Sequence, residues 1–310
     1  MTVSRLNPSQ QVDSLWSLGG LTWRQLGRRV WGGISETDLI DRAYELAYNF
    51  LLAVFPMLLF LFSLCGLFVR ESSKLRLDLL VYLQLAVPPA AYQLLHRTLE
   101  EITKNPQAGK LTFGILFALF SGSAGTTQLI STLNAAYEVR EARSWVKVHL
   151  ISLGLTIAIS ILIIAALFLL LAGGHIIAYL GETLGISGVA FVAAKVLQWT
   201  FTLGFVVFAF AVVYYFAPDV EEQHWYWITP GSVFGVAVWG LASAVLRAYL
   251  HFFNTYTRTY GSLGAVIILM LWFYVTGLAI LLGGQINATI EHAAAEHGHA
   301  EAKGPGQKAA

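Results

Sequence analysis

The chain alternates long apolar stretches with short segments that carry most of its charges. Six stretches contain no Asp, Glu, Lys or Arg, and together they hold 162 of the 310 residues. A membrane-spanning helix needs about 20 mostly apolar residues. The pattern therefore predicts an all-α, polytopic membrane protein: a six-transmembrane-helix bundle with amphipathic helices at the interface. We place the spans near residues 48–68, 111–133, 150–172, 196–217, 229–252 and 263–286.

A seventh apolar stretch, residues 79–96, differs from these six because Pro88 and Pro89 lie at its middle. Proline removes a backbone hydrogen-bond donor, and the residue before it avoids helical geometry. Unpaired backbone groups are costly in lipid. We therefore interpret residues 70–108 as interfacial amphipathic helices, with a re-entrant hairpin as the alternative.

The two ends of the chain differ from the transmembrane domain at 37–291. We expect no signal peptide after Met1, because an apolar core with a small-residue cleavage site is missing. We interpret residues 1–36 as an amphipathic segment at the lipid headgroups, since Trp suits the boundary and Arg suits phosphates. We expect residues 292–310 to form a disordered tail. The candidate lipid-facing residues are Trp23, Arg24, Arg28, Arg29 and Trp31.

Six spans place both termini on one side of the membrane. That side carries ten Lys and Arg residues and the other side carries eight. Under the positive-inside rule this difference favours cytoplasmic termini. Accessibility labelling of a cysteine placed at Gly306 distinguishes the two orientations.

Composition excludes several classes of protein. Only 12% of the residues are charged, against about 25% in a soluble domain, and the mean hydropathy is +0.64. A disordered chain, a collagen and a nucleic-acid-binding domain are disfavoured, and the net charge of +1 gives no reason to expect a nucleic-acid partner. Cys65 alone forms no intrachain disulfide. The chain contains no phosphate-binding loop, HExxH, paired CxxC or GxSxG motif, so we predict no metal site, cofactor or catalytic residue.

Polar side chains are costly in lipid, and the second predicted span carries a stripe of them. Ser121, Gly125, Gln128 and Thr132 recur at helical spacing, and Asn134 ends the adjoining stripe. Two interpretations stay open. The stripe is either a close contact between helices, where small and hydroxyl side chains pack and hydrogen bond, or the wall of a substrate cavity.

The fifth predicted span carries a second stripe, formed by Ser243, Arg247, His251 and Asn254. A guanidinium pairs well with phosphate or carboxylate, so the stripe is a candidate anion site. In the alternative interpretation Arg247 extends to the interface and His251 is structural. The full set of candidate cavity residues is Asn49, Gln128, Asn134, Ser243, Arg247, His251, Asn254, Tyr260, Gln285 and Asn287, with Pro56, Gly261 and Gly264 as hinge or turn positions.

Several short motifs resemble the YihY/BrkB family of bacterial inner-membrane proteins over roughly residues 37–291. Gln285 stands where that family commonly has an acidic or polar residue, which argues against a proton-carrying carboxylate there. The motifs are Asp41-Arg42-Ala43 to Pro56, Asn134 to Tyr137 with Arg143, Tyr214-Tyr215 with Pro218, Trp227 with Pro230-Gly231, Tyr260 to Gly264, Leu271 to Tyr274, and Gly283 to Asn287.

The resemblance implies six transmembrane helices, an inner-membrane location and no established biochemical activity. Family names record a tRNA-processing ribonuclease label, widely regarded as a misassignment, and a role in serum resistance. We predict a non-enzymatic transporter or lipid-handling protein whose partners are membrane lipids and an amphipathic anionic substrate. The alternative is a membrane scaffold linked to envelope integrity. A ribonuclease is disfavoured because the loops lack an acid–base or metal constellation beside a basic groove.

Overall fold

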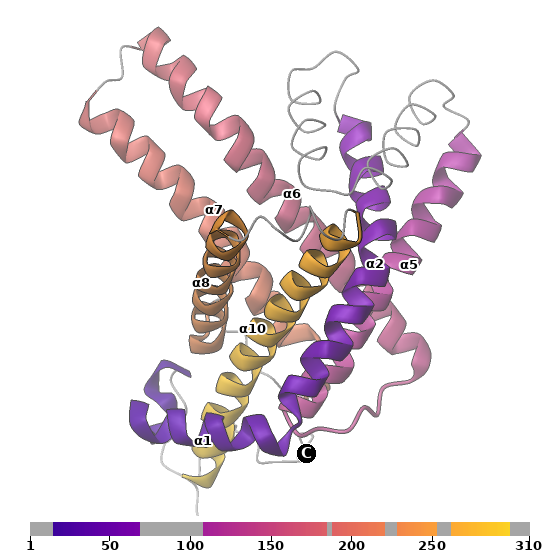
Figure 1. Cartoon of the computed structure of the whole chain (residues 1–310), viewed down its shortest axis with the longest axis vertical. Coiled ribbons are helices and arrows are strands. Elements are labelled where there is room, and N and C mark those ends of the chain that lie inside the picture. The colour runs from indigo at the N-terminus through magenta and orange to yellow at the C-terminus, as the bar shows by residue number, and fades with distance from the viewer. Residues whose placement is uncertain (1–14, 69–107, 185–187, 221–227, 253–261, 298–310) are drawn as a thin grey trace, which may run out of the picture.

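The computed structural model describes residues 15–68, 108–184, 188–220, 228–252 and 262–297, and every described element is a helix (Figure 1). The prediction of an all-α membrane protein is thereby confirmed. In chain order the elements are the short 3-10 helix η2 (Leu15–Gly20), α1 (Trp23–Glu36), α2 (Leu39–Phe68), α5 (Ala108–Ala136), α6 (Trp145–Leu184), α7 (Val189–Phe216), α8 (Pro230–Phe252) and α10 (Ser262–Glu296).

Each predicted span lies on one long helix to within one residue at its ends, although α2 and α6 extend well beyond their predicted spans. Within the described residues, parts of α6, α7, α8 and α10 are long and apolar enough to cross a membrane. α2 and α5 have 30 and 29 residues. The total of six spans stays a prediction, and the predicted interfacial helices at 70–108 lie almost entirely outside the described residues.

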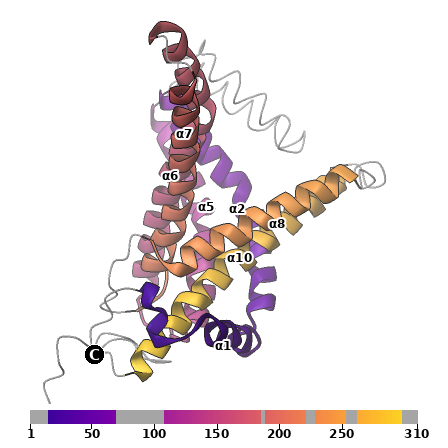
Figure 2. The same cartoon turned by 90° about the vertical axis from the view of Figure 1, so that its left-hand side faces the viewer.

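The long helices pack as neighbouring pairs: α2 with α5, α6 with α7, and α8 with α10. Because α10 also packs on α2, it lies at the centre of the bundle, between α2 and α8. Figures 1 and 2 show the α6–α7 pair diverging from the other helices toward the end opposite α1. With 40 residues α6 is about 60 Å long, twice the thickness of the hydrocarbon core. The main core lies at the α1 end of the bundle, where Leu46, Leu133 and Leu281 are fully buried.

The helix α1 lies across the end of the bundle and packs on the last turns of α10 (Figure 1). It begins with a capping box, in which the Gln25 amide donates to the Thr22 hydroxyl and the Thr22 amide donates to the Gln25 side chain. Leu18, Leu21 and Leu26 form one apolar cluster with Ile286, Ile290 and Ala293. The N-terminal helix and the C-terminal end of α10 therefore lie at the same end of the molecule.

The predicted start of the disordered tail is wrong at residues 292–296. α10 continues to Glu296, and Ala293 and Ala294 are buried beneath the segment that precedes α1. The composition of this segment is that of a solvated tail, but alanine is a strong helix former and its small side chain permits close packing. Residues 298–310 lie outside the described residues.

Candidate functional site

The predicted site residues do not form one cluster. Asn49 and Pro56 lie in α2, Gln128 and Asn134 in α5, and Gly264, Gln285 and Asn287 in α10. Ser243, Arg247 and His251 lie in α8, whereas Asn254, Tyr260 and Gly261 lie outside the described residues. The structure instead distributes most of the described polar residues among separate helix contacts, while Asn49 donates to the Glu45 carbonyl of its own helix, and an apolar groove lies between α8 and α10.

The first contact, the Asn287 junction, joins the start of α8 to α10. The side-chain oxygen of Asn287 accepts from the Gly231 amide at 2.9 Å, and its side-chain nitrogen donates to the Thr229 hydroxyl at 3.0 Å. Thr229 and Ser232 cap the helix reciprocally, each backbone amide donating to the other's hydroxyl at 3.0 Å. Because Asn287 is 2% exposed, α8 begins at a fixed point inside the protein.

Two glycines make the Asn287 junction possible. A Cβ atom on Gly231 would collide with the Gly283 carbonyl oxygen, and one on Gly283 would collide with the Tyr214 hydroxyl and lie 2.5 Å from the Gly231 carbonyl oxygen. That Tyr214 hydroxyl, which comes from α7, donates to the Ile280 carbonyl at 2.8 Å. Three helices therefore meet here at backbone distance, a contact that only glycine permits.

The second contact, the Arg143 node, joins the α5–α6 connection to the end of α7. Arg143 donates two hydrogen bonds to the Glu141 carboxylate at 2.7 and 2.8 Å and one to the Ala217 carbonyl at 2.8 Å. Its guanidinium also lies 3.5 Å from Asp219. Asn134 completes the node, since it donates to Glu141 at 2.8 Å and accepts from the Asp219 amide at 2.7 Å. The Arg143 side chain is 7% exposed.

The Arg143 node is expected to weaken in acid. Burial raises the pKa of Glu141, but hydrogen bonds from Arg143 and Asn134 outweigh it and leave the pKa below its ordinary 4.5. The contribution to stability is therefore present above 4.5 and is lost as the pH falls through the lowered folded-state pKa. Thermal unfolding in detergent at decreasing pH measures this loss. In Glu141→Gln the unfolding temperature should depend less steeply on pH. An unchanged dependence would contradict the role of Glu141 in the acid sensitivity of the node.

The third contact lies along α5, at the predicted polar stripe and at Thr126 beside it. The Thr126 hydroxyl lies 2.8 Å from the Ser152 hydroxyl and 2.7 Å from that of Thr156, both in α6. Gly125 faces α2, where a Cβ atom would lie 3.2 Å from the Phe50 ring, and Gln128 donates to Glu45 of α2 at 3.1 Å. These contacts favour the packing interpretation of the stripe over the cavity wall.

Gln285 lies where α1 crosses α10. Gln285 is 4% exposed. Among the described residues, its side-chain oxygen is the one buried side-chain N or O atom without a hydrogen-bond partner. Gly33 of α1 presses on the same amide, and a Cβ atom there would collide with the amide nitrogen. This part of α1 therefore sits directly on a buried polar group.

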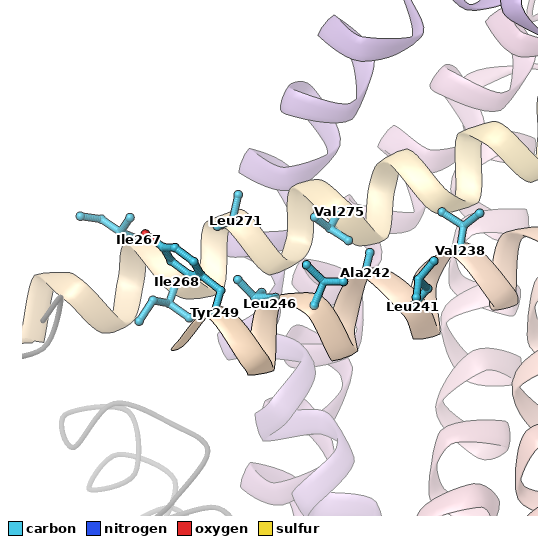
Figure 3. Close-up of a pocket in the computed structure, with 10 residues that line it drawn as sticks. Val238, Leu241, Ala242, Leu246, Tyr249, Ile267, Ile268, Leu271 and Val275 are labelled. Carbon is cyan, nitrogen blue, oxygen red and sulfur yellow. The ribbon is translucent and has the colours of Figure 1, made fainter. Parts of the chain in front are cut away.

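The α8–α10 groove is apolar and has a volume of about 590 Å³ (Figure 3). The Tyr249 hydroxyl is the one side-chain polar group among its lining residues. The lining residues are Val238, Leu241, Ala242, Val245, Leu246 and Tyr249 of α8 and Ile267, Ile268, Leu271 and Val275 of α10.

The predicted stripe on α8 does not line this groove. Ser243 accepts a hydrogen bond from the Trp272 indole of α10 at 3.2 Å. Arg247 is exposed, and its position along the helix places it on a different face from Val245, Leu246 and Tyr249. Arg247 nevertheless lies at the same depth along α8 as the far end of the groove.

Sequence reasoning missed the Arg143 node and the caps on α8. Arg143, Tyr214 and Gly231 occur in the family motifs, but the motifs gave them no structural role. Asn134 and Asp219 are 85 residues apart, so no local pattern links them. Among the described residues, no three His, Cys, Asp or Glu side chains gather as a metal site would require.

Comparison with known proteins identifies relatives over most of the chain. The family model described as virulence factor BrkB matches residues 30–307. A "putative ribonuclease-like protein YfkH" of Bacillus subtilis is 34% identical over 81% of this chain and 89% of its own length. A "UPF0761 membrane protein" of Tolumonas auensis is 24% identical over 85% of this chain and 83% of its own.

A further "UPF0761 membrane protein", from Xanthomonas oryzae, is 26% identical, and the chain spans 60% of its length. No solved structure matches the chain. The matched region includes the Asn287 junction, the Arg143 node and the α8–α10 groove. The predicted resemblance is confirmed, and the chain belongs to the BrkB family of membrane proteins.

Proposed function

We propose that this protein is a non-enzymatic, lipid-handling protein of the inner membrane that binds the apolar chain of an amphiphile in the α8–α10 groove. The observation that carries the proposal is the groove itself. Its volume of about 590 Å³ lies in the range typical of ligand pockets, and its lining is almost wholly apolar. From Val238 to Tyr249 it follows α8 for about 16 Å, close to the hydrocarbon depth of one leaflet.

The groove extends from the middle of α8 toward its C-terminal end, away from α1, so with cytoplasmic termini we expect it to extend into the outer leaflet of the inner membrane. Arg247 is the only Lys, Arg, Asp or Glu in α8, and it is exposed. It lies at the depth of the far end of the groove but on a different face of α8, so it supplies positive charge at that depth and does not enter the groove. This arrangement favours an anionic headgroup.

Narrowing the groove is expected to release bound lipid. Ala242 lines the groove, and Ala244 on the same helix is exposed and is not among its lining residues. Ala242→Phe should therefore lower the amount of lipid that co-purifies with the protein, because the new ring occupies the space of the chain. Ala244→Phe is the matched control and should retain it. Native mass spectrometry of the detergent-solubilised proteins measures the bound lipid, and equal retention in both variants would exclude the groove as a lipid site.

A membrane scaffold is the second candidate function. The observation in its favour is that the Thr126 and Thr127 hydroxyls of α5 lie within hydrogen-bond distance of hydroxyl groups on α6, while Thr132 donates to carbonyls of its own helix. In a scaffold these groups serve helix packing alone. A wild-type protein that retains no lipid in the groove experiment would favour this candidate.

A further inference from the structure

The two faces of α1 differ in chemistry. Leu26 and Gly33 are buried against the bundle. Trp23 and Trp31 are 70% and 76% exposed, the Arg24 and Arg28 side chains are exposed beside them, and all four residues share one face by helical spacing. We call these four residues the α1 patch. Such exposure of two large aromatic rings indicates a surface that contacts something other than the described helices.

The charges on α1 are all positive over most of its length. Residues 15–35 contain three arginines and no acidic residue. Arg29, which the sequence grouped with the lipid-facing residues, lies toward α10 and pairs with Glu296 at 2.8 Å. Arg24 and Arg28, one helical turn apart, therefore carry the positive charge of the outward face.

The depth of α1 suits lipid headgroups. α1 and the segment before it pack on Ile286, Ile290 and Ala293, at and beyond the predicted end of the last span at residue 286. Figure 1 shows α1 crossing the end of the bundle rather than running along it. Trp concentrates at the boundary between hydrocarbon and water, and Arg pairs with phosphate.

We propose that the α1 patch binds the phosphate of an anionic membrane lipid, with Arg24 and Arg28 holding the phosphate and the two tryptophans flanking it. Gly27 lies between them by helical spacing, and a Cβ atom on it would meet nothing within 4 Å, so the headgroup can approach the helix backbone there. The patch is separate from the α8–α10 groove, because Val275 and Ile286 are about 16 Å apart along α10.

The test measures lipid selectivity in full-length protein that also carries Ala242→Phe, so that lipid in the groove does not contribute. The protein is incubated with equal amounts of phosphatidylglycerol and phosphatidylcholine, and native mass spectrometry gives the ratio retained. Arg24→Gln with Arg28→Gln should lower the ratio about thirtyfold, since each arginine near a lipid surface contributes about fivefold. Arg29→Gln, the control on the side of α1 that faces Glu296, should leave the ratio unchanged.

Two further measurements keep the test decisive. Arg24→Lys with Arg28→Lys preserves the charge and should retain most of the selectivity, and circular dichroism verifies the helix content of every variant. An unchanged ratio in the folded glutamine pair would overturn the proposal. Displacement of phosphatidylglycerol by excess inorganic phosphate would assign the patch to a soluble phosphate and would also overturn it. Either result leaves the groove experiment intact, because that experiment varies Ala242 with the patch unaltered.

Discussion

Replacing Gly283 or Gly231 by alanine is expected to destabilise the protein by about 3 to 5 kcal/mol, a large part of the total stability of a typical domain. The added methyl group on Gly231 collides with the Gly283 carbonyl, and the one on Gly283 collides with the Tyr214 hydroxyl. Separation of the helices would also break the bond from the Gly231 amide to Asn287. Thermal unfolding in detergent, followed by size-exclusion chromatography, measures the loss.

The chain supplies a matched control on the same helix. A Cβ atom on Gly240 of α8 would meet nothing within 4 Å, so Gly240→Ala should be neutral or stabilise by up to about 1 kcal/mol. Tyr214→Phe should partly rescue Gly283→Ala, because it removes one of the two colliding groups, and should not rescue Gly231→Ala. Equal stability of the Gly231→Ala and Gly240→Ala proteins would show that the helices do not meet at this distance.

Replacing Arg143 by methionine is expected to cost about 3 kcal/mol, the lower end of the range for breaking a buried ion pair, because the Glu141 side chain is 30% exposed. The substitution leaves the Glu141 and Asp219 carboxylates without the guanidinium, and it removes the donor to the Ala217 carbonyl at the end of α7. An unpaired charge at a partly buried site is far more destabilising than the loss of a surface ion pair. The midpoint of thermal unfolding at neutral pH measures the effect.

Arg140 provides the comparison for Arg143. It lies in the same α5–α6 connection and is exposed, so Arg140→Met should change the stability little. Arg143→Lys keeps the charge but not the two parallel bonds to Glu141, and it should recover only part of the loss. If Arg143→Met and Arg140→Met unfold at the same temperature, the node does not hold α7.

The long helices were predictable because hydrophobic length alone determines where a chain can cross a membrane. The span predicted at 229–252 also begins within one residue of α8, whose first residue, Pro230, suits the first turn of a helix. The C-terminal extent of α10 was not predictable from local sequence. The burial of Ala293 depends on contacts with α1 and the segment before it, which are distant in the sequence. On α5 the polar stripe lies partly at a helix contact, through Gly125 and Gln128 against α2, but spacing could not say which neighbour each side chain faces.

The candidate sites, too, could be predicted from the sequence only in part. The sequence placed Arg247 in α8 but could not reveal the groove, because Leu271 and Val275 belong to another helix. It also grouped Arg29 with Arg24 and Arg28, although Glu296 draws Arg29 to the opposite side of α1. Asn287 was recognised as a polar residue near the end of a span, whereas its role in beginning α8 depends on Thr229 and Gly231.

The packing of α1 on α10 has a consequence for biosynthesis. Arg29 and Glu296 are separated by 267 positions, so a ribosome that adds about 5 to 20 residues per second needs on the order of 13 to 53 seconds to connect them. Throughout that interval α1 has been synthesised but α10, on which it packs, has not. During this time the Trp and Arg side chains of α1 give it affinity for the membrane surface. Closure of the N-terminal helix onto α10 is thus among the last steps of assembly, and only a chain translated through α10 can complete it.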